Sequence, residues 1–245
     1  MITYLSFGAG VNTTAILHIP DVMEKIDMVI FADTGAEKPE TYQYIEKYVK
    51  PFLRGIGKEF TSVKGSEKIG GKNIDNLYDA CYLWKLIPSR MLRFCTDKFK
   101  IKPIKQYFQN NFPEERVRAI IGIAYDEAYR INNIRWDGQE IWYPLVERKI
   151  TRNGCINIIK NAGWEIPVKS GCFFCPFQTR REWYWLRYTH PDLWQKAIAL
   201  EKNGSRYPEL LLWKEPLEKI DRKYIALEKY DVEHDVEECG GVCFL

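Results

Sequence analysis

The stretch Tyr4-Leu-Ser-Phe-Gly-Ala-Gly-Val-Asn-Thr-Thr-Ala-Ile-Leu17 decides the fold. It predicts a short apolar strand, a loop of small residues from Ser6 to Thr13, and the first turn of a helix. At such a turn backbone N–H groups point outward, glycines admit a phosphate, and the helix dipole favours negative charge. The loop is neither a Walker A loop nor a G-x-G-x-x-G motif. It predicts an anion site, although glycine at a strand-to-helix turn also serves packing alone.

Composition limits the class of protein. A chain of 245 residues with 46% hydrophobic content can bury a full core and is most simply one domain, with room for an appendage. No apolar run is long enough for a membrane span and no signal peptide is evident, so we expect a cytoplasmic protein without a membrane partner. Seven cysteines, an odd number, do not suggest a disulfide framework. A net charge of +3 is too small to indicate nucleic acid by itself.

Strands and helices alternate after the first strand. Apolar strands are predicted at Met28–Asp33, Glu59–Val63 and Val117–Ala124, with helices at 37–52, 77–86 and 97–111. This alternation predicts an α/β fold, a Rossmann-like parallel sheet with helices on both faces. Because ligands bind at the carboxyl ends of such strands, we expect the loop after the first strand, Asp33–Gly35 and Gly122–Asp126 to gather at one edge.

The alternation of strands and helices ends at about residue 150. A helix is predicted at 149–162, followed by a cysteine loop at 170–177 and by tryptophan-rich helices. We therefore expect a nucleotide-binding α/β domain at 1–150. Residues 151–245 would form a helical C-terminal cap that carries the C-x-x-C loop and a cysteine-containing tail.

The pair Cys172-Phe-Phe-Cys175, followed by Pro176, has the spacing of two ligands to one metal centre. Further ligands would come from Cys95, Cys239 or Cys243. Structural zinc, an iron–sulfur cluster and a redox dithiol all remain open on spacing alone. The other two cysteines, Cys81 and Cys155, are interpreted as packing residues.

The order of the motifs resembles the phosphoadenosine phosphosulfate (PAPS) reductase-like family of the adenine nucleotide α-hydrolase, or PP-loop ATP pyrophosphatase, superfamily. The resemblance covers about residues 3–177 and implies a HUP-like sheet. It is carried by Ser6–Thr13, Asp33–Thr41, Arg93–Ile104, Gly122–Arg130, Trp142–Glu147 and the Gly-Cys-x-x-Cys-Pro loop.

The resemblance implies ATP, with Mg²⁺ on its phosphates, bound at the carboxyl edge of the sheet. Lys100 and Arg130 are the implied catalytic cations, for which a solvated face or a surface ion pair is the alternative. The implied nucleotide-binding residues are Ser6, Gly8, Gly10, Asn12, Thr13, Asp33, Thr34, Gly35 and Gly122.

The function implied is an ATP pyrophosphatase-type sulfurtransferase, similar to enzymes of nucleic-acid thiolation and DNA phosphorothioation. It would adenylate an acceptor, expected to be nucleic acid, for insertion of sulfur from a cysteine desulfurase or another donor; an oligomer is compatible with this. An iron–sulfur cluster, 4Fe-4S with zinc as the alternative, would be held by Cys95, Cys172, Cys175 and a tail cysteine, Cys243 or Cys239.

Two other functions remain open. A PAPS or adenosine-phosphosulfate reductase would use Cys239, in Glu238-Cys-Gly240, as its nucleophile. The usual His after that motif is missing, and Thr96 stands where such reductases carry an adjacent cysteine. A non-catalytic nucleotide-binding module with structural zinc is the third hypothesis.

A surface for a nucleic-acid strand is the last prediction. Basic and aromatic side chains that could form it are Lys98, Lys100, Lys102, Lys105, Arg180, Arg181, Trp183 and Trp185. The alternative, which we favour for the tryptophans, is a core beneath a solvated lysine face.

Overall fold

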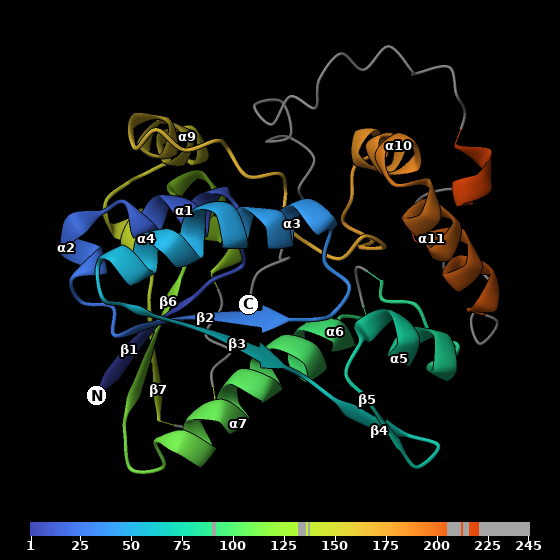
Figure 1. The fold of residues 1–245 in the computed structure, drawn as a ribbon, viewed down its shortest axis with the longest axis horizontal. Helices are drawn as coiled ribbons and strands as arrows, with labels where there is room; N and C mark the ends of the chain where they lie inside the picture. The colour runs from blue at the N-terminus through green and yellow to red at the C-terminus, as the bar shows by residue number, and fades with distance from the viewer. Residues whose placement is uncertain (90–91, 132–135, 137, 205–211, 213–215, 221–245) are drawn as a thin grey trace.

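The computed structural model describes residues 1–89, 92–131, 136, 138–204, 212 and 216–220. Within these residues five strands form one parallel sheet (Figure 1). The strands stand in the order β3-β2-β1-β6-β7. Their bounds are β1 Ile2–Ser6, β2 Met28–Asp33, β3 Glu59–Lys64, β6 Val117–Ile121 and β7 Gln139–Trp142.

The central strand is β1, which pairs with β2 on one side and β6 on the other; Tyr4 lies opposite both Met28 and Ala119. The chain first builds outward from β1 through β2 to β3 and then returns to the other side of β1. The order of the strands therefore reverses between β1 and β6, and in open α/β sheets the ligand crevice lies outside the carboxyl ends at this place.

Both faces of the sheet are buried, and alternate residues of each strand face opposite cores. Leu5, Val29 and Ile120 pack in one core, beneath α1 (Val11–Leu17), α2 (Pro20–Met23) and α9 (Arg152–Asn161). The continuous run α3 (Pro39–Tyr44), η1 (Ile45–Val49) and α4 (Lys50–Gly55) covers the same face.

The opposite face is covered by the run α6 (Phe94–Thr96), η2 (Asp97–Ile101) and α7 (Lys102–Asn111), as Figure 1 shows for α7. Tyr4, Ile30 and Ala119 of the strands pack there against Ile104 and Phe108 of α7.

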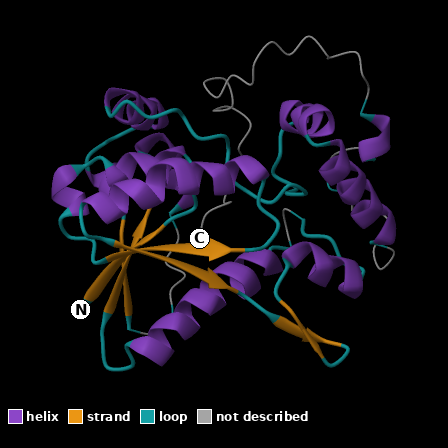
Figure 2. Ribbon diagram, viewed as in Figure 1, coloured by secondary structure: helices purple, strands orange, loops and turns teal. Residues whose placement is uncertain are grey.

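A second body of helices lies beside the sheet (Figure 2). It contains α5 (Leu77–Trp84), α10 (Arg180–Thr189), α11 (Pro191–Asn203) and the short η4 (Leu217–Lys219). These helices share one apolar core with Cys172 and Phe174 of the cysteine loop. A β4–β5 hairpin (Glu67–Ile69, Lys72–Ile74), η3 (Tyr125–Arg130) and α8 (Pro144–Glu147) complete the described elements.

The predicted α/β fold is confirmed, with corrections at the ends of elements. The strand predicted to end at Ala124 ends at Ile121, because the chain turns there into η3. The helix predicted from residue 149 begins at Arg152, where the Thr151 side chain caps it by accepting from Gly154 N. Strand β7 and the β4–β5 hairpin were not predicted.

Helix α9 packs on α1 in the first core, and the domain boundary at 150 stays a prediction. Of the helices described, none has the length and apolarity needed to span a bilayer.

Candidate functional site

The loop from Ser6 to Thr13 joins β1 to α1 at the carboxyl edge of the sheet. Ala9 adopts a left-handed conformation with φ of 56°, and Gly10 precedes the helix without a capping side chain. A cavity of about 30 Å³ lies against this loop. Four predicted site residues of the loop and its neighbours line it together with Lys100 of η2: Ser6, Gly8, Thr13 and Gly122. The loop after β1 and the Gly122 turn therefore gather as expected, whereas none of Asp33–Gly35 lines this cavity.

Gly122 follows β6 and touches the loop at the place where the strand order reverses. A Cβ there would lie 2.6 Å from Thr13 Cγ2 and 3.1 Å from Thr13 N. The backbones of β6 and α1 approach this closely only because residue 122 has no side chain.

Replacing Gly122 by alanine is expected to push the Thr13 turn away from β6. Overpacking of this kind costs about 1–3 kcal/mol, and each 1.4 kcal/mol taken from binding weakens it about tenfold. We expect lower stability in urea and, if the loop binds ATP as the resemblance implies, at least about tenfold weaker ATP binding by calorimetry. Gly55→Ala, at a helical glycine with nothing within 4 Å of its Cβ, is the control and should leave both unchanged or raise stability slightly. Unaltered ATP affinity in Gly122→Ala would contradict the prediction.

Asn12 and Arg130 are joined by a carboxylate that sequence reasoning did not single out. Glu127 accepts from Asn12 Nδ2 at 2.7 Å and from Arg130 Nη1 at 2.7 Å, while Asn12 also donates to Gly122 O at 3.2 Å. Arg130 is therefore a buried ion-pair partner beside the loop rather than an exposed cation. Glu127 therefore accepts hydrogen bonds from two donors, Asn12 and Arg130, that a bound anion could otherwise use.

Asp33 ends β2 and organises the next turn. Its Oδ1 accepts from Gly35 N at 2.8 Å and from the Tyr42 hydroxyl at 2.7 Å, and its Oδ2 lies 3.8 Å from Lys64 Nζ. Burial and the hydrogen bond to Asp33 raise the pKa of Tyr42 well above its ordinary value, so this phenol stays a donor. Gly35 has φ of 70° and presents its carbonyl to Asn76 Nδ2 at 2.7 Å.

Three of the predicted metal ligands come together in the second core. Cys172 is buried, and Cys95 and Cys175 are partly buried beside it. Burial, with the neighbouring Cys175 as a further cause, raises the pKa of Cys95, and burial followed by the Glu37 carboxylate raises that of Cys172. Within the part of the chain that the structure describes, no three His, Cys, Asp or Glu side chains form a ready-made metal site.

Elsewhere Cys81 and Cys155 are fully buried, as expected of packing residues. Burial raises the pKa of Cys155 to about 12.

A line of short contacts joins the loop cavity to the cysteines. Lys100 Nζ lies 3.7 Å from Glu37 Oε1, and Cys172 Sγ lies 4.0 Å from the same oxygen. Thr34 Oγ1 contacts both, at 3.2 Å from Glu37 Oε1 and 3.3 Å from Cys172 Sγ. The two candidate sites are thus in direct contact through one carboxylate.

Buried charges fasten the cysteine loop at both ends. Lys169 Nζ donates to Phe177 O at 3.2 Å and to Glu182 Oε2 at 2.7 Å. Lys38, which is 2% exposed, donates to Lys169 O at 3.4 Å and lies 3.7 Å from Glu182 Oε1. Glu182 also accepts from Thr179 N in a capping box at the start of α10. Two ammonium groups and one carboxylate therefore hold the residues that carry Cys172 and Cys175.

The two tryptophans considered for a stacking surface pack in the second core. Trp183 is buried there and Trp185 is partly buried against it, in agreement with the interpretation that we favoured for them. Lys98 and Lys102 both reach Glu67, at 2.8 and 3.9 Å, so part of the lysine row is paired.

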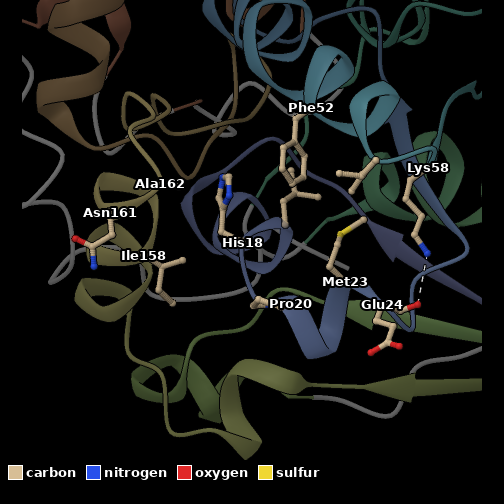
Figure 3. A pocket seen from close by; sticks show the side chains of 11 residues that line it. His18, Pro20, Met23, Glu24, Phe52, Lys58, Ile158, Asn161 and Ala162 are labelled. Atoms are coloured by element: carbon tan, nitrogen blue, oxygen red, sulfur yellow. Dashed lines mark hydrogen bonds between the residues drawn. The ribbon is translucent and has the colours of Figure 1, made fainter.

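A larger pocket lies at the opposite edge of the sheet and was not predicted. It has a volume of about 690 Å³ and lies between α2, the last turns of α1, α4 and α9, and the residue before β3 (Figure 3). His18 and Phe52 face it, and Lys58 Nζ donates to Glu24 O at 3.4 Å on its rim. The His18 ring packs edge-on against Trp164 with centroids 4.4 Å apart, and burial lowers its pKa.

Other expectations fall on residues that the structure does not describe. Cys239, Cys243 and Trp213 lie outside the described ranges, and the roles expected of the two tail cysteines stay predictions. Glu37 and Glu127 lie inside the quoted motifs but were not singled out from the sequence. An amino-acid sequence alone does not show whether a given carboxylate is exposed or has partners inside the fold.

Comparisons with known proteins give distant relatives. No family model matches the chain. The uncharacterized proteins MJ0066 and MJ0973 of Methanocaldococcus jannaschii are 25% identical over 213 residues and 24% identical over 236 residues. These matches cover 78% and 86% of this chain but 40% and 51% of those proteins, so the chain spans about half the length of the curated relatives it matches. A solved structure, the U34-tRNA thiolase NcsA from Methanococcus maripaludis with its [4Fe-4S] cluster, has a TM-score of 0.45 at 13% identity. That alignment covers 86% of this chain and 73% of the thiolase chain.

Proposed function

We propose that this chain is a PP-loop ATP pyrophosphatase-type sulfurtransferase whose acceptor is a nucleic acid. The observation that carries the proposal is the contact line Lys100–Glu37–Cys172. It places a cation of the loop cavity and a cysteine of the C-x-x-C pair on one buried carboxylate. A sulfurtransferase that first adenylates its acceptor needs phosphate chemistry and sulfur chemistry side by side, and this arrangement supplies both.

The reaction proposed has two balanced steps. An oxygen of the acceptor attacks the α-phosphorus of ATP, the bond between the α- and β-phosphates breaks, and pyrophosphate leaves with Mg²⁺. Hydrosulfide from a sulfur donor then displaces AMP from the adenylated carbon or phosphorus, so that sulfur replaces oxygen without a net redox change. The backbone of Ser6–Thr13 would bind the phosphates, and the Lys100 ammonium would stabilise charge that develops at the α-phosphate.

The donor set at the cysteine loop fits an iron–sulfur cluster. Cys95, Cys172 and Cys175 supply three sulfur ligands within an apolar layer. Iron–sulfur clusters and zinc both prefer such soft sulfur ligands. Metal binding removes the thiol protons that burial otherwise retains. A bound cluster would supply a place to hold the incoming sulfur. The chain's own part is to present the three sulfurs and to exclude water through Phe173 and Phe174, which are buried beside them.

The test is a single anaerobic experiment on the full chain. The protein is incubated with ATP, Mg²⁺, sulfide and a mixture of RNA and DNA, and pyrophosphate and thionucleosides are measured. We expect nucleic-acid-dependent release of pyrophosphate in step with thionucleoside formation. Lys100→Ala should lower this rate about 100- to 1000-fold, as expected for loss of a charge-stabilising donor.

Lys105→Ala is the matched control, because Lys105 lies on α7, which continues the helical run of Lys100, and does not line the loop cavity. It should keep the wild-type rate. Protein that carries iron and sulfide but releases no pyrophosphate from ATP would overturn the proposed function. The reductase alternative rests on Cys239 and the zinc-module alternative on a metal; both predict no pyrophosphate release.

A further inference from the structure

One of the two carboxylate oxygens of Glu37 is buried without a hydrogen-bond partner among the described residues. The side chain is 2% exposed. Its Oε1 accepts from Thr34 Oγ1 and lies near Lys100 Nζ and Cys172 Sγ. Its Oε2 is buried and has no hydrogen-bond partner among the described residues. A buried carboxylate oxygen without a partner costs several kcal/mol, so proteins keep one mainly where a ligand completes it.

The backbone holds this carboxylate in register with the cysteine loop. Glu37 and Cys172 form an antiparallel bridge, and Phe173 N donates to Ala36 O at 3.0 Å. The turn before Glu37 is fixed from the other side by Asn76 Nδ2 on Gly35 O at 2.7 Å. Glu37 is therefore attached to Cys172 by main-chain hydrogen bonds, although 135 positions separate the two residues in the chain.

We propose that Glu37 is itself a ligand of the metal centre. Its Oε2 would bind one iron, beside the sulfurs of Cys95, Cys172 and Cys175. This inference rests on the proposed function, since it presupposes the cluster. Carboxylate oxygen is an established ligand of protein-bound iron. The other oxygen of the same carboxylate, Oε1, lies 4.0 Å from Cys172 Sγ, so the carboxylate stands directly beside the cysteine loop. Oε1 would keep Lys100 as its outer partner, which orients the carboxylate and offsets part of the charge of four anionic ligands.

The experiment compares wild type with Glu37→Ala and Glu37→Cys after anaerobic reconstitution with iron and sulfide. Iron and sulfide per chain and the electron paramagnetic resonance spectrum are measured. Glu37→Ala is expected to lose about one iron per chain and to change the spectrum to that of an incomplete cluster. Glu37→Cys, which offers a thiolate at the same place, should restore the iron and give a third, distinct spectrum. This recovery would show that the iron is lost in the alanine variant because a ligand at position 37 is missing.

Glu40→Ala is the matched control. Glu40 stands three positions further along the same segment but pairs with His190 Nε2 at 2.7 Å rather than with the cysteines, so its removal should leave iron and spectrum unchanged. Cys239→Ser and Cys243→Ser test the competing ligands. Wild-type iron and spectrum in Glu37→Ala, with loss in either tail variant, would overturn the assignment of Glu37 and leave the proposed function standing. A wild-type chain that binds no iron would instead overturn the cluster, and the Glu37 assignment with it.

Discussion

Replacing Cys172 by serine is expected to remove nearly all bound iron and sulfide from the reconstituted protein. Cys172 is the most buried of the three sulfurs, and its Sγ is the one held between Thr34 and Glu37. A serine oxygen is a harder ligand that keeps its proton at neutral pH, and the apolar layer around it disfavours the charged form further. With the proposed four-iron cluster, the iron content should fall from about four per chain to a small fraction of that.

Cys155→Ser is the control for this substitution. Cys155 is buried even more deeply than Cys172, but it lies in the first core on α9. It should reduce stability and leave the iron content per folded chain at the wild-type value. Equal iron in Cys172→Ser and wild type would contradict the placement of the cluster on the C-x-x-C loop.

Replacing Glu182 by glutamine is expected to lower the free energy of unfolding by about 3–5 kcal/mol. The substitution keeps the shape of the side chain but leaves the ammonium groups of Lys38 and Lys169 without their buried counter-charge. Urea unfolding measures the change. Glu165→Gln, at an ion pair with Lys47 in which both side chains are mostly exposed, should change stability far less. Equal effects of the two substitutions would show that the buried network contributes little.

The difference in stability between wild type and Glu182→Gln should also depend on pH, in a direction that the pKa of Glu182 determines. Burial alone would raise the pKa of Glu182, but Lys38 and Lys169 more than reverse this and hold it below the ordinary value of 4.5. A carboxyl whose pKa is lower in the folded state stabilises above its unfolded pKa, and that contribution is lost as pH falls through the folded value. The gap in stability between wild type and Glu182→Gln should therefore be constant above about pH 5 and shrink below about pH 4.5.

Much of the fold could be predicted because its signals are local and periodic. Met28–Asp33 is buried on both faces and has an unbroken apolar run, so its limits were predicted without error. Strand β7 and the β4–β5 hairpin were not predicted because their stretches are short and polar and carry no periodic apolar pattern. The sequence of β7, for example, is Gln139-Glu-Ile-Trp142. Their strand structure comes from pairing with a neighbour, which a single sequence does not display.

The candidate site also contains some residues that could be predicted from the sequence and others that could not. Ser6–Thr13 and Gly122 could be expected together because the carboxyl ends of adjacent parallel strands meet at one edge. Burial of Lys38, Glu37 and Glu182 could not be expected, because lysine and glutamate are almost always exposed in folded proteins. Their burial arises only in the tertiary structure, where two segments more than a hundred positions apart enclose them.

The position of β1 at the centre of the sheet has a consequence for synthesis of the chain. Its first neighbour, β2, emerges soon after it, but 110 residues separate Ser6 from Val117 of β6, its second neighbour. At about 5–20 residues per second, the ribosome needs roughly 5–20 s to deliver that partner. During this interval an edge of β1 that is paired in the folded protein is open to wrong partners, including β1 of a neighbouring nascent chain. Slower translation of this interval would prolong that exposure and lower the yield of folded protein.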